Sequence, residues 1–164
     1  MLTNGAVDQD ATDKVVIRMS ELNPKKMGGT MRLGSRPTTF QKGAEKSKVL
    51  VMYQSKVYYD SPFKRSERRI SLDQIPASDF VVDERHRHRY EVNPRYVERF
   101  ESKGLKFVGR GDEGNRMEIL ELDNHPWFVG TQYHPEYKSR VLEPSRPFLG
   151  FVATAAGCLD RFVL

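Results

Sequence analysis

The alternation of apolar and polar residues predicts several short strands separated by turns. Stretches with a strand-like pattern lie at residues 14–19, 85–92, 105–109, 116–122 and 125–133. A helix is expected after the second stretch, because Asn93 suits the N-cap position and Pro94 the first helical position. Val97 and Phe100 would share the apolar face of this helix, and Gly104 would end it.

A last helix is predicted to start at Ser145-Arg146-Pro147. Its apolar stripe would comprise Phe148, Phe151, Val152, Ala155, Leu159, Phe162 and Val163. Residues 35–77 have no clean period, so we expect a long surface loop there with one or two short strands, and the polar residues 1–13 predict an unpaired start. Strands followed by a late helix favour an α/β sheet that binds a ligand at the strand ends.

Length and composition narrow the class of protein. The chain has 164 residues, 38% apolar and 30% charged, which suits one domain and excludes collagen-like, coiled-coil and wholly disordered chains. Its apolar stretches are much shorter than a bilayer-spanning helix, and the N-terminus lacks the apolar core of a signal peptide. The single cysteine, Cys158, cannot form an internal disulfide. We therefore expect a cytoplasmic protein with no membrane partner.

The positive charge is concentrated in one segment. Residues 42–69 contain eight Lys and Arg against three Asp and Glu, which accounts for the whole net charge of +5. A basic segment on a neutral body is weak support for nucleic-acid binding, which usually requires a basic face with stacking aromatic residues. Nucleic acid is therefore not the expected partner.

His134 and Glu136 are the first candidates for chemistry, in the sequence Tyr133-His134-Pro135-Glu136-Tyr137. They follow an apolar strand, where α/β folds present catalytic groups. A carboxylate two residues away can hold the imidazole by one nitrogen, so that the other takes a proton from a thiol or gives one to a leaving amine. The alternative is a turn histidine that simply bonds a nearby carboxylate.

His86 and His88 lie among arginines and allow three interpretations. His-x-His puts both imidazoles on one face of a strand, as in a metal site, but the cationic neighbours disfavour a metal ion. The arginines could instead clamp a carboxylate ligand. The third interpretation is a polar strand held by ion pairs, in which Arg87 or Arg89 is matched to Glu84 or Glu91.

Six motifs in one order resemble a known family. They are MGGTMRLG (27–34), ERHRHRYEVNP (84–94), LKFVG (105–109), MEILEL (117–122), HPWFVGTQYHPEY (125–137) and PFLGFV (147–152). Together they resemble the C-terminal part of the glutamine amidotransferase domain of the CTP synthase family. The likeness covers most of residues 14–160. Residues 1–164 would then be a partial amidotransferase domain with a poorly matching basic insertion at about 42–77.

This resemblance implies a flavodoxin-like α/β domain of the class I, triad type. Such a domain hydrolyses glutamine with a Cys-His-Glu triad, and the ammonia aminates UTP to CTP in a synthase domain that uses ATP and Mg²⁺. His134 would be the triad histidine, Glu136 its carboxylate and Arg89 the arginine that binds glutamine. The implied partners are glutamine, the synthase domain and, in the full-length protein, further copies of the chain. No cofactor or metal is implied for this chain itself.

The sequence also departs from the family pattern. It has no Gly-x-Cys-Leu-Gly segment to carry the nucleophile, and Cys158 falls after the histidine within the last helical pattern, where we expect a packed helix residue. The chain alone is therefore expected to be inactive and to be a fragment, a truncated gene model or a divergent copy, with apolar edges and faces left exposed. The competing function is that of a non-catalytic pseudo-amidotransferase, or a basic interaction or nucleic-acid-binding module.

Overall fold

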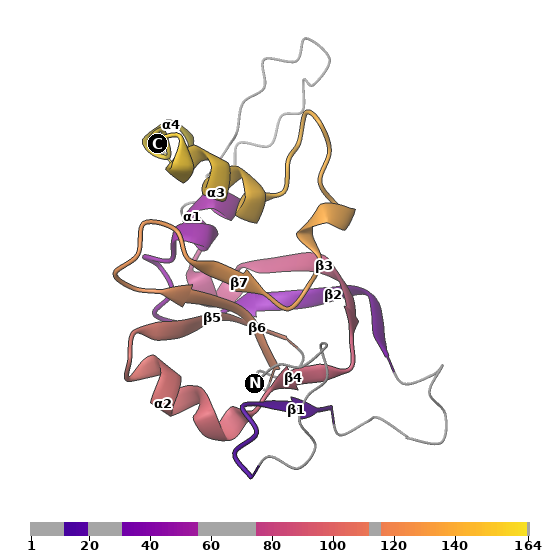
Figure 1. Ribbon diagram of the computed structural model, residues 1–164. Coiled ribbons are helices and arrows are strands. Elements are labelled where there is room, and N and C mark those ends of the chain that lie inside the picture. Colours follow the sequence, from indigo (N-terminus) through magenta and orange to yellow (C-terminus); the bar gives the residue numbers. More distant parts are fainter. Residues whose placement is uncertain (1–11, 20–30, 56–74, 112–115, 164) are drawn as a thin grey trace.

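A five-stranded antiparallel sheet forms the centre of the structure, a computed structural model that describes residues 12–19, 31–55, 75–111 and 116–163 (Figure 1). The strand order is β3-β2-β5-β6-β7. The strands are β2 (Arg32–Phe40), β3 (Val81–His88), β5 (Leu105–Gly111), β6 (Arg116–Leu122) and β7 (Val129–Thr131). The longest pairing joins β2 to β3, with Arg32 opposite His88 and Gly34 opposite His86.

A two-stranded ribbon of β1 (Val16–Arg18) and β4 (Tyr90–Val92) lies beside this sheet. The chain passes from β3 to β4 through a bend at Arg89, whose carbonyl accepts a hydrogen bond from the Met19 amide at 3.1 Å. The Asn93 side chain donates to the Lys14 carbonyl at 2.7 Å and accepts from the Arg95 amide at 3.1 Å. One side chain thus closes the ribbon and caps the helix that follows.

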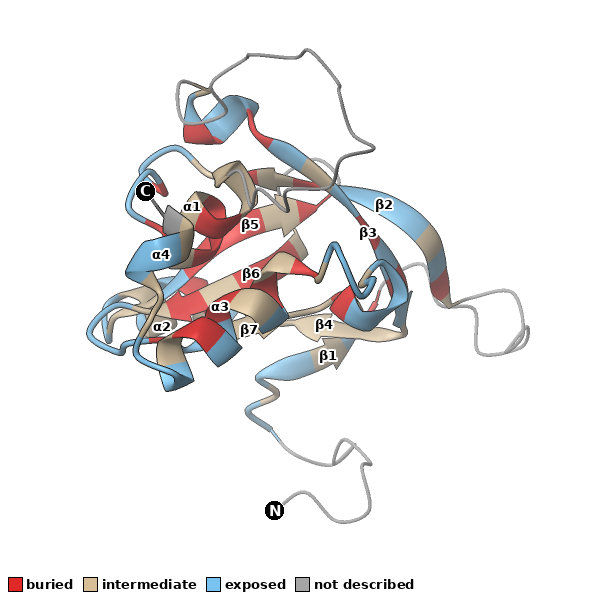
Figure 2. Ribbon diagram, turned by 90° about the horizontal axis from the view of Figure 1, so that it is seen from above, coloured by how far each residue is buried: buried red, intermediate tan, exposed pale blue. Residues whose placement is uncertain are grey.

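Helices cover both faces of the sheet (Figures 1 and 2). On one side lie α1 (Lys48–Gln54), α3 (Arg146–Ala155) and α4 (Asp160–Val163); on the other, the 3-10 turn Pro94–Tyr96 continues into α2 (Val97–Glu101). The larger core contains Phe40, Ala44, Val49, Leu50, Met52, Ala77, Phe80, Val108, Ile119, Trp127 and Tyr133. The smaller core, next to α2, contains Val97, Phe107 and Met117. No helix in the described ranges is long and apolar enough to cross a bilayer.

A buried carboxylate attaches α1 to the sheet. Glu121 of β6 is 5% exposed and accepts hydrogen bonds from the Ser47 hydroxyl and the Val49 amide, both at 2.8 Å, and from the Lys48 amide at 3.2 Å. A carboxylate at this place satisfies amides that have no partner within the helix and lies at the positive end of the helix dipole. The start of α1 is therefore fixed by a residue more than seventy positions later.

Trp127 packs directly on the backbone of α3 at Gly150. A methyl group added to Gly150 would come within 3.0 Å of several atoms of the indole ring. Trp127 is 7% exposed, and α3 buries Pro147, Gly150 and Ala153. Two of the motifs, HPW and PFLGFV, are thus in contact, and the glycine is required by the indole.

The expected strand at 116–122, the strand at 105–109 and the helix after Asn93 are confirmed, with Gly104 at a positive φ of 86° behind α2. The long surface loop is wrong for residues 35–55. β2 continues to Phe40, and residues 48–54 form α1, whose Val49, Leu50 and Met52 are buried. The reason is a helical spacing of apolar residues behind the Ser47 N-cap.

Two further expectations are corrected. Of residues 125–133 only Val129–Thr131 is strand, because Pro126 has no amide proton and His125 accepts the Trp127 amide at 3.1 Å in a turn. The final helix stops at Ala155, and Gly157 has a positive φ of 66°. Cys158 therefore lies in a turn and not in a helix, and its amide bonds the Ala153 carbonyl at 2.8 Å.

The expected stripe of the last helix is also wrong in part. Phe148, Phe151 and Val152 are 45%, 60% and 60% exposed, since the small residues of α3 face the indole instead. The expectations for residues 1–11 and for residues 56–74 of the predicted loop and basic segment lie outside the described residues.

Candidate functional site

His134 and Glu136 lie in a turn that leaves the end of β7. The His134 amide donates to the Arg85 carbonyl at 2.9 Å, which ties this segment to β3. Pro135 starts a 3-10 turn, Pro135–Tyr137, that brings the Glu136 carboxylate back over the imidazole. His134 Nδ1 lies 2.8 Å from Glu136 Oε1, and the two side chains are 40% and 51% exposed.

This hydrogen bond decides which nitrogen of His134 can react. A carboxylate only accepts, so the proton lies on Nδ1 and the Nε2 lone pair is left to act as a base. The pKa of Glu136 is lowered by the hydrogen bond from its own backbone amide and then by that from His134. An ionised Glu136 orients the ring and would stabilise the imidazolium that forms once Nε2 takes a proton.

Arg89 is connected to this turn through β3. It lies at the bend after His88, half-buried, whereas the His134 segment meets the same strand at Arg85. Arg85 and Arg89 are four residues apart, and four residues of extended strand span about 13 Å, so the backbone at Arg89 lies about that far along the strand from the His134 contact. Its assignment as the residue that binds glutamine stays a prediction, as do the catalytic roles of His134 and Glu136.

A buried polar network supports the residue before His134. The Tyr53 hydroxyl donates to Glu84 Oε1 at 2.8 Å and lies 3.1 Å from the Tyr133 hydroxyl. Burial raises the pKa of Tyr53, Tyr133 and Glu84. These groups are therefore held in their protonated forms over a wider pH range than in water. The network joins α1, β3 and the His134 segment.

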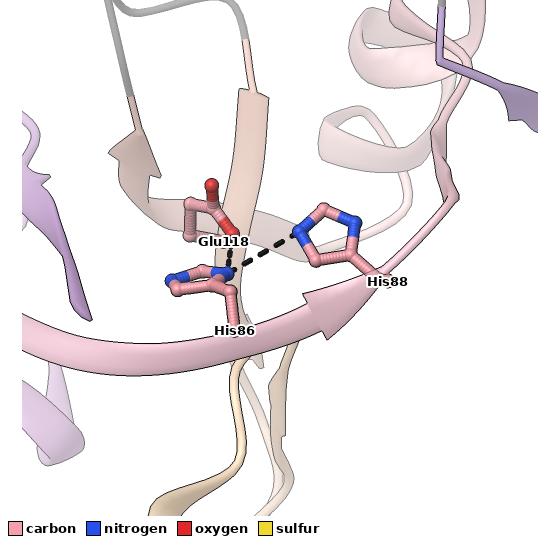
Figure 3. A group of neighbouring side chains, drawn as sticks. All are labelled: His86, His88 and Glu118. Atoms are coloured by element: carbon pink, nitrogen blue, oxygen red, sulfur yellow. Dashed lines mark hydrogen bonds and ion pairs between the residues drawn. The ribbon is translucent and has the colours of Figure 1, made fainter. Parts of the chain in front are cut away.

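His86 and His88 point from β3 toward Glu118 of β6 (Figure 3). His86 Nδ1 lies 3.3 Å from His88 Nε2 and 3.6 Å from Glu118 Oε2. Arg32 Nη1 reaches the same place, 2.8 Å from His86 Nδ1 and 2.9 Å from Glu118 Oε1. Burial lowers the pKa of His88, as do the charges of Arg32, Arg116 and His134, against a hydrogen bond to the Tyr90 carbonyl that raises it.

Two glutamates of the predicted polar strand have partners on other elements. Glu84 accepts from Tyr53 rather than from an arginine, and Glu91 pairs with Arg116 at 3.3 Å. Arg87 is exposed on the opposite face of β3, away from the buried histidine. The polar strand therefore has partners on β2, β6 and α1, and the expected pairing of Arg87 or Arg89 within the strand stays a prediction.

An apolar groove of about 730 Å³ begins beside Glu136. Phe128, Phe148 and Phe151 line it and remain 46%, 45% and 60% exposed. Aromatic side chains exposed together in this way are typical of an interaction surface or a ligand-binding groove.

Comparison with known proteins settles the family. Residues 9–154 match the family model described as glutamine amidotransferase class-I. The chain belongs to this family. Its architecture, in which helices pack on a β-sheet, confirms the α/β fold class expected from the sequence.

Relatives of this amidotransferase chain are much longer than the chain itself. It is 48% identical to a CTP synthase of Neurospora crassa over 97% of its own length and 24% of the relative's. It is 49% identical to CTP synthase 1 of Saccharomyces cerevisiae, covering 95% of this chain and 23% of that one. The chain thus spans about a quarter of the length of these relatives.

A solved structure resembles the amidotransferase fold as well. The glutaminase domain of Trypanosoma brucei CTPS with bound acivicin superposes with a TM-score of 0.66 at 29% identity. The match covers 92% of this chain and 48% of that one.

Sequence reasoning missed three buried or half-buried polar residues. Arg32 and Glu118 contact His86, and Tyr53 contacts Tyr133, the residue before His134. A signal for Glu118 existed, because it stands in RMEILEL between Met117 and Ile119, which are both buried. A carboxylate inside so apolar a strand needs a partner. The sequence spacing could not predict that Arg32 would be the cation that pairs with Glu118.

Proposed function

We propose that this chain is part of the glutamine-hydrolysing half of a CTP synthase, and that His134 and Glu136 are its triad histidine and carboxylate. The observation that carries the proposal is the 2.8 Å hydrogen bond between His134 Nδ1 and Glu136 Oε1, in a chain of the amidotransferase family. The names of the relatives supply two activities, CTP synthesis and glutamine hydrolysis. In the proposed reaction, ammonia released from glutamine would aminate UTP to CTP in a synthase domain that uses ATP and Mg²⁺.

The histidine would act first as a base and then as an acid. Nε2 of His134 removes the proton of a cysteine thiol, and the thiolate attacks the carbon of the glutamine side-chain amide. His134 then gives that proton to the leaving nitrogen, so that ammonia departs and a thioester remains. Water hydrolyses the thioester with the same histidine as base. Glu136 holds the tautomer and stabilises the positive ring in both steps.

Arg89 would bind the substrate rather than take part in bond changes. A guanidinium matches the planar α-carboxylate of free glutamine with two parallel hydrogen bonds. This binding would place the amide carbon of glutamine near His134. Replacing the arginine would therefore raise the KM of glutamine.

The thiol would come from a polypeptide segment other than the one that carries Cys158. Cys158 lies in the turn between α3 and α4, with its amide bonded to Ala153, and α3 separates it in sequence from the turn at His134. We propose that the nucleophile segment packs on the apolar groove beside Glu136, which would cover Phe128, Phe148 and Phe151. By itself the chain should release no ammonia from glutamine.

A chimera tests this proposal. The corresponding segment of the yeast CTP synthase 1 is replaced by residues 12–164, and CTP formation is measured with glutamine and, separately, with ammonia as the nitrogen source. His134→Ala should lower the glutamine-dependent rate by about 10²–10⁴-fold, the usual contribution of a general base, and leave the ammonia-dependent rate unchanged. Arg89→Ala should raise the KM of glutamine by about 10–100-fold, as expected when a charge-assisted hydrogen bond is lost.

Two results would refute the assignment. One is a chimera whose glutamine-dependent rate is insensitive to His134→Ala. The other is ammonia release by the 164-residue chain alone that disappears in Cys158→Ala, since this would make Cys158 the nucleophile.

A further inference from the structure

Apart from His134 and Glu136, the strongest feature is the buried cluster of His86, His88 and Glu118. His86 and Glu118 are 2% and 1% exposed, and His88 is half-buried. One ligand atom from each residue lies within 4.8 Å of the other two. In Figure 3 the two imidazoles and the carboxylate converge on one point between β3 and β6.

Hydrogen bonds fix how the two imidazoles face that point. The Tyr90 carbonyl, 2.9 Å from His88 Nδ1, only accepts, so Nδ1 carries a proton and the neutral ring has its lone pair on Nε2. A guanidinium only donates, so His86 Nδ1 accepts the 2.8 Å hydrogen bond from Arg32. Both lone pairs therefore point into the cluster, alongside the Glu118 carboxylate.

The spacing of these atoms is that of a tetrahedral transition-metal site. With metal–ligand distances near 2.0–2.1 Å, tetrahedral geometry puts two ligand atoms about 3.3–3.4 Å apart. The His86 Nδ1 to His88 Nε2 distance is 3.3 Å, and the His86 Nδ1 to Glu118 Oε2 distance is 3.6 Å. The bond from His88 to the Tyr90 carbonyl is the outer contact that metal-binding histidines usually make.

Arg32 occupies the point where the ligands meet. Its Nη1 lies 2.8 Å from His86 Nδ1, 2.9 Å from Glu118 Oε1 and 3.5 Å from His88 Nε2. A guanidinium nitrogen and a dication cannot share this volume, and two positive charges at such a distance would repel strongly in a buried site.

We propose that His86, His88 and Glu118 form a closed cation site, that the Arg32 guanidinium is its resident cation, and that a divalent ion of the zinc class binds there once the guanidinium is removed. The inference does not depend on the proposed function. It also explains why a His-x-His pair can stand among arginines. The guanidinium of Arg32 occupies the position that a metal ion would take, so a positive charge is part of the site.

The resident cation also holds the segment that leads to His134. The Glu118 carbonyl accepts a hydrogen bond from the Gln132 amide at 2.8 Å, and the His86 ring packs edge-on against Tyr133 with centroids 5.9 Å apart. Arg32 therefore acts as a positioning residue, because it draws together the two strands against which residues 132–134 lie.

The test uses the full 164-residue chain with Cys158→Ser throughout, which removes the thiol as a rival ligand. Co²⁺ is titrated, and the strong visible absorption of tetrahedral cobalt reports binding. Arg32→Ala should bind Co²⁺ more than tenfold tighter than the chain with Arg32, the change that about 1.4 kcal/mol produces. Arg32→Lys is the matched control: it keeps a cation in place and should stay as weak as the chain with Arg32.

Removal of a ligand distinguishes this site from adventitious binding. Adding His88→Ala to Arg32→Ala should abolish the tetrahedral spectrum. If Arg32→Ala is unfolded without metal, Zn²⁺ should restore the native Trp127 fluorescence, and it should fail to do so in the double variant, since metal binding and folding are coupled. Equal Co²⁺ affinity with and without Arg32, binding that survives His88→Ala, or an unfolded Arg32→Ala that Zn²⁺ does not refold would each overturn the proposal.

Discussion

Replacing Gly150 with alanine should destabilise the protein, although alanine is the better helix former. In an exposed helix this change would gain about 1 kcal/mol. Here the new methyl group would enter the space of the Trp127 indole, which is 7% exposed and is surrounded by the larger core. Overpacking of a core typically costs about 1–3 kcal/mol, and a ring enclosed on its other sides cannot withdraw. Because three ring atoms would lie only 2.0–2.6 Å away, we expect the clash to cost about 2–3 kcal/mol, the upper part of this range, which leaves a net loss of about 1–2 kcal/mol.

Urea unfolding measures this loss, with the fluorescence of Trp127, the only tryptophan of the chain, as the signal. For a urea slope of about 2 kcal/mol per molar, in the middle of the usual range, the midpoint should fall by roughly 0.5–1 M. Val152→Ala is the matched control, because it changes a 60% exposed residue of the same helix and should stay within about 0.5 kcal/mol of the unchanged chain. The reasoning fails if Gly150→Ala is as stable as the unchanged chain or more so.

Three further changes probe other buried polar groups. Burial raises the pKa of the Glu84 carboxyl above its ordinary 4.5, so the native state holds this proton more tightly than the unfolded state does. The protein should therefore lose stability as the pH rises above the ordinary pKa, by at most about 1.4 kcal/mol per pH unit. Glu84→Gln should flatten this fall in urea midpoints measured from about pH 5 to 7.5, and an unchanged slope would contradict the reasoning. Glu121→Ala should cost roughly 2–4 kcal/mol because the first turn of α1 loses its buried acceptor, with Glu121→Gln milder; equal urea midpoints for the two variants would count against the role of the charge. Asn93→Ala should cost about 1 kcal/mol and speed amide exchange in β1, since it removes both the helix cap and the bond to the ribbon; exchange in β1 that stays as slow as before would refute the link.

Sequence reasoning did best where one residue period was sustained. RMEILEL alternates apart from the adjacent Ile119 and Leu120, and it is β6 from its first residue to its last. It did worst in AEKSKVLVMYQ, where VLVMYQ is rich in strand-forming residues but follows an N-cap serine, and the buried carboxylate that completes this cap is Glu121. A partner so distant in sequence leaves no local trace, so a short apolar run there could be read as strand or helix.

The candidate site shows the same division between local and distant contacts. His134 and Glu136 could be predicted as a pair because they are only two positions apart and the proline between them starts the turn that brings their side chains together. The cluster of His86 and His88 could not be completed, because its carboxylate and its cation come from two other strands. Their meeting depends on the curl and register of the sheet, which spacing along one strand does not contain.

The end of α1 and the start of the following described segment lie next to one another. The Gln54 side-chain amide donates to the Ile75 carbonyl at 3.1 Å, so these two points of the described chain are in direct contact. The conformational entropy of closing a loop between two such points grows slowly, by about 0.6 kcal/mol per doubling of its length. The short distance between these two points is useful for protein engineering: a short glycine-serine link, or a reporter domain whose own termini are close, could join Gln54 to Ile75 without stretching the described segments on either side.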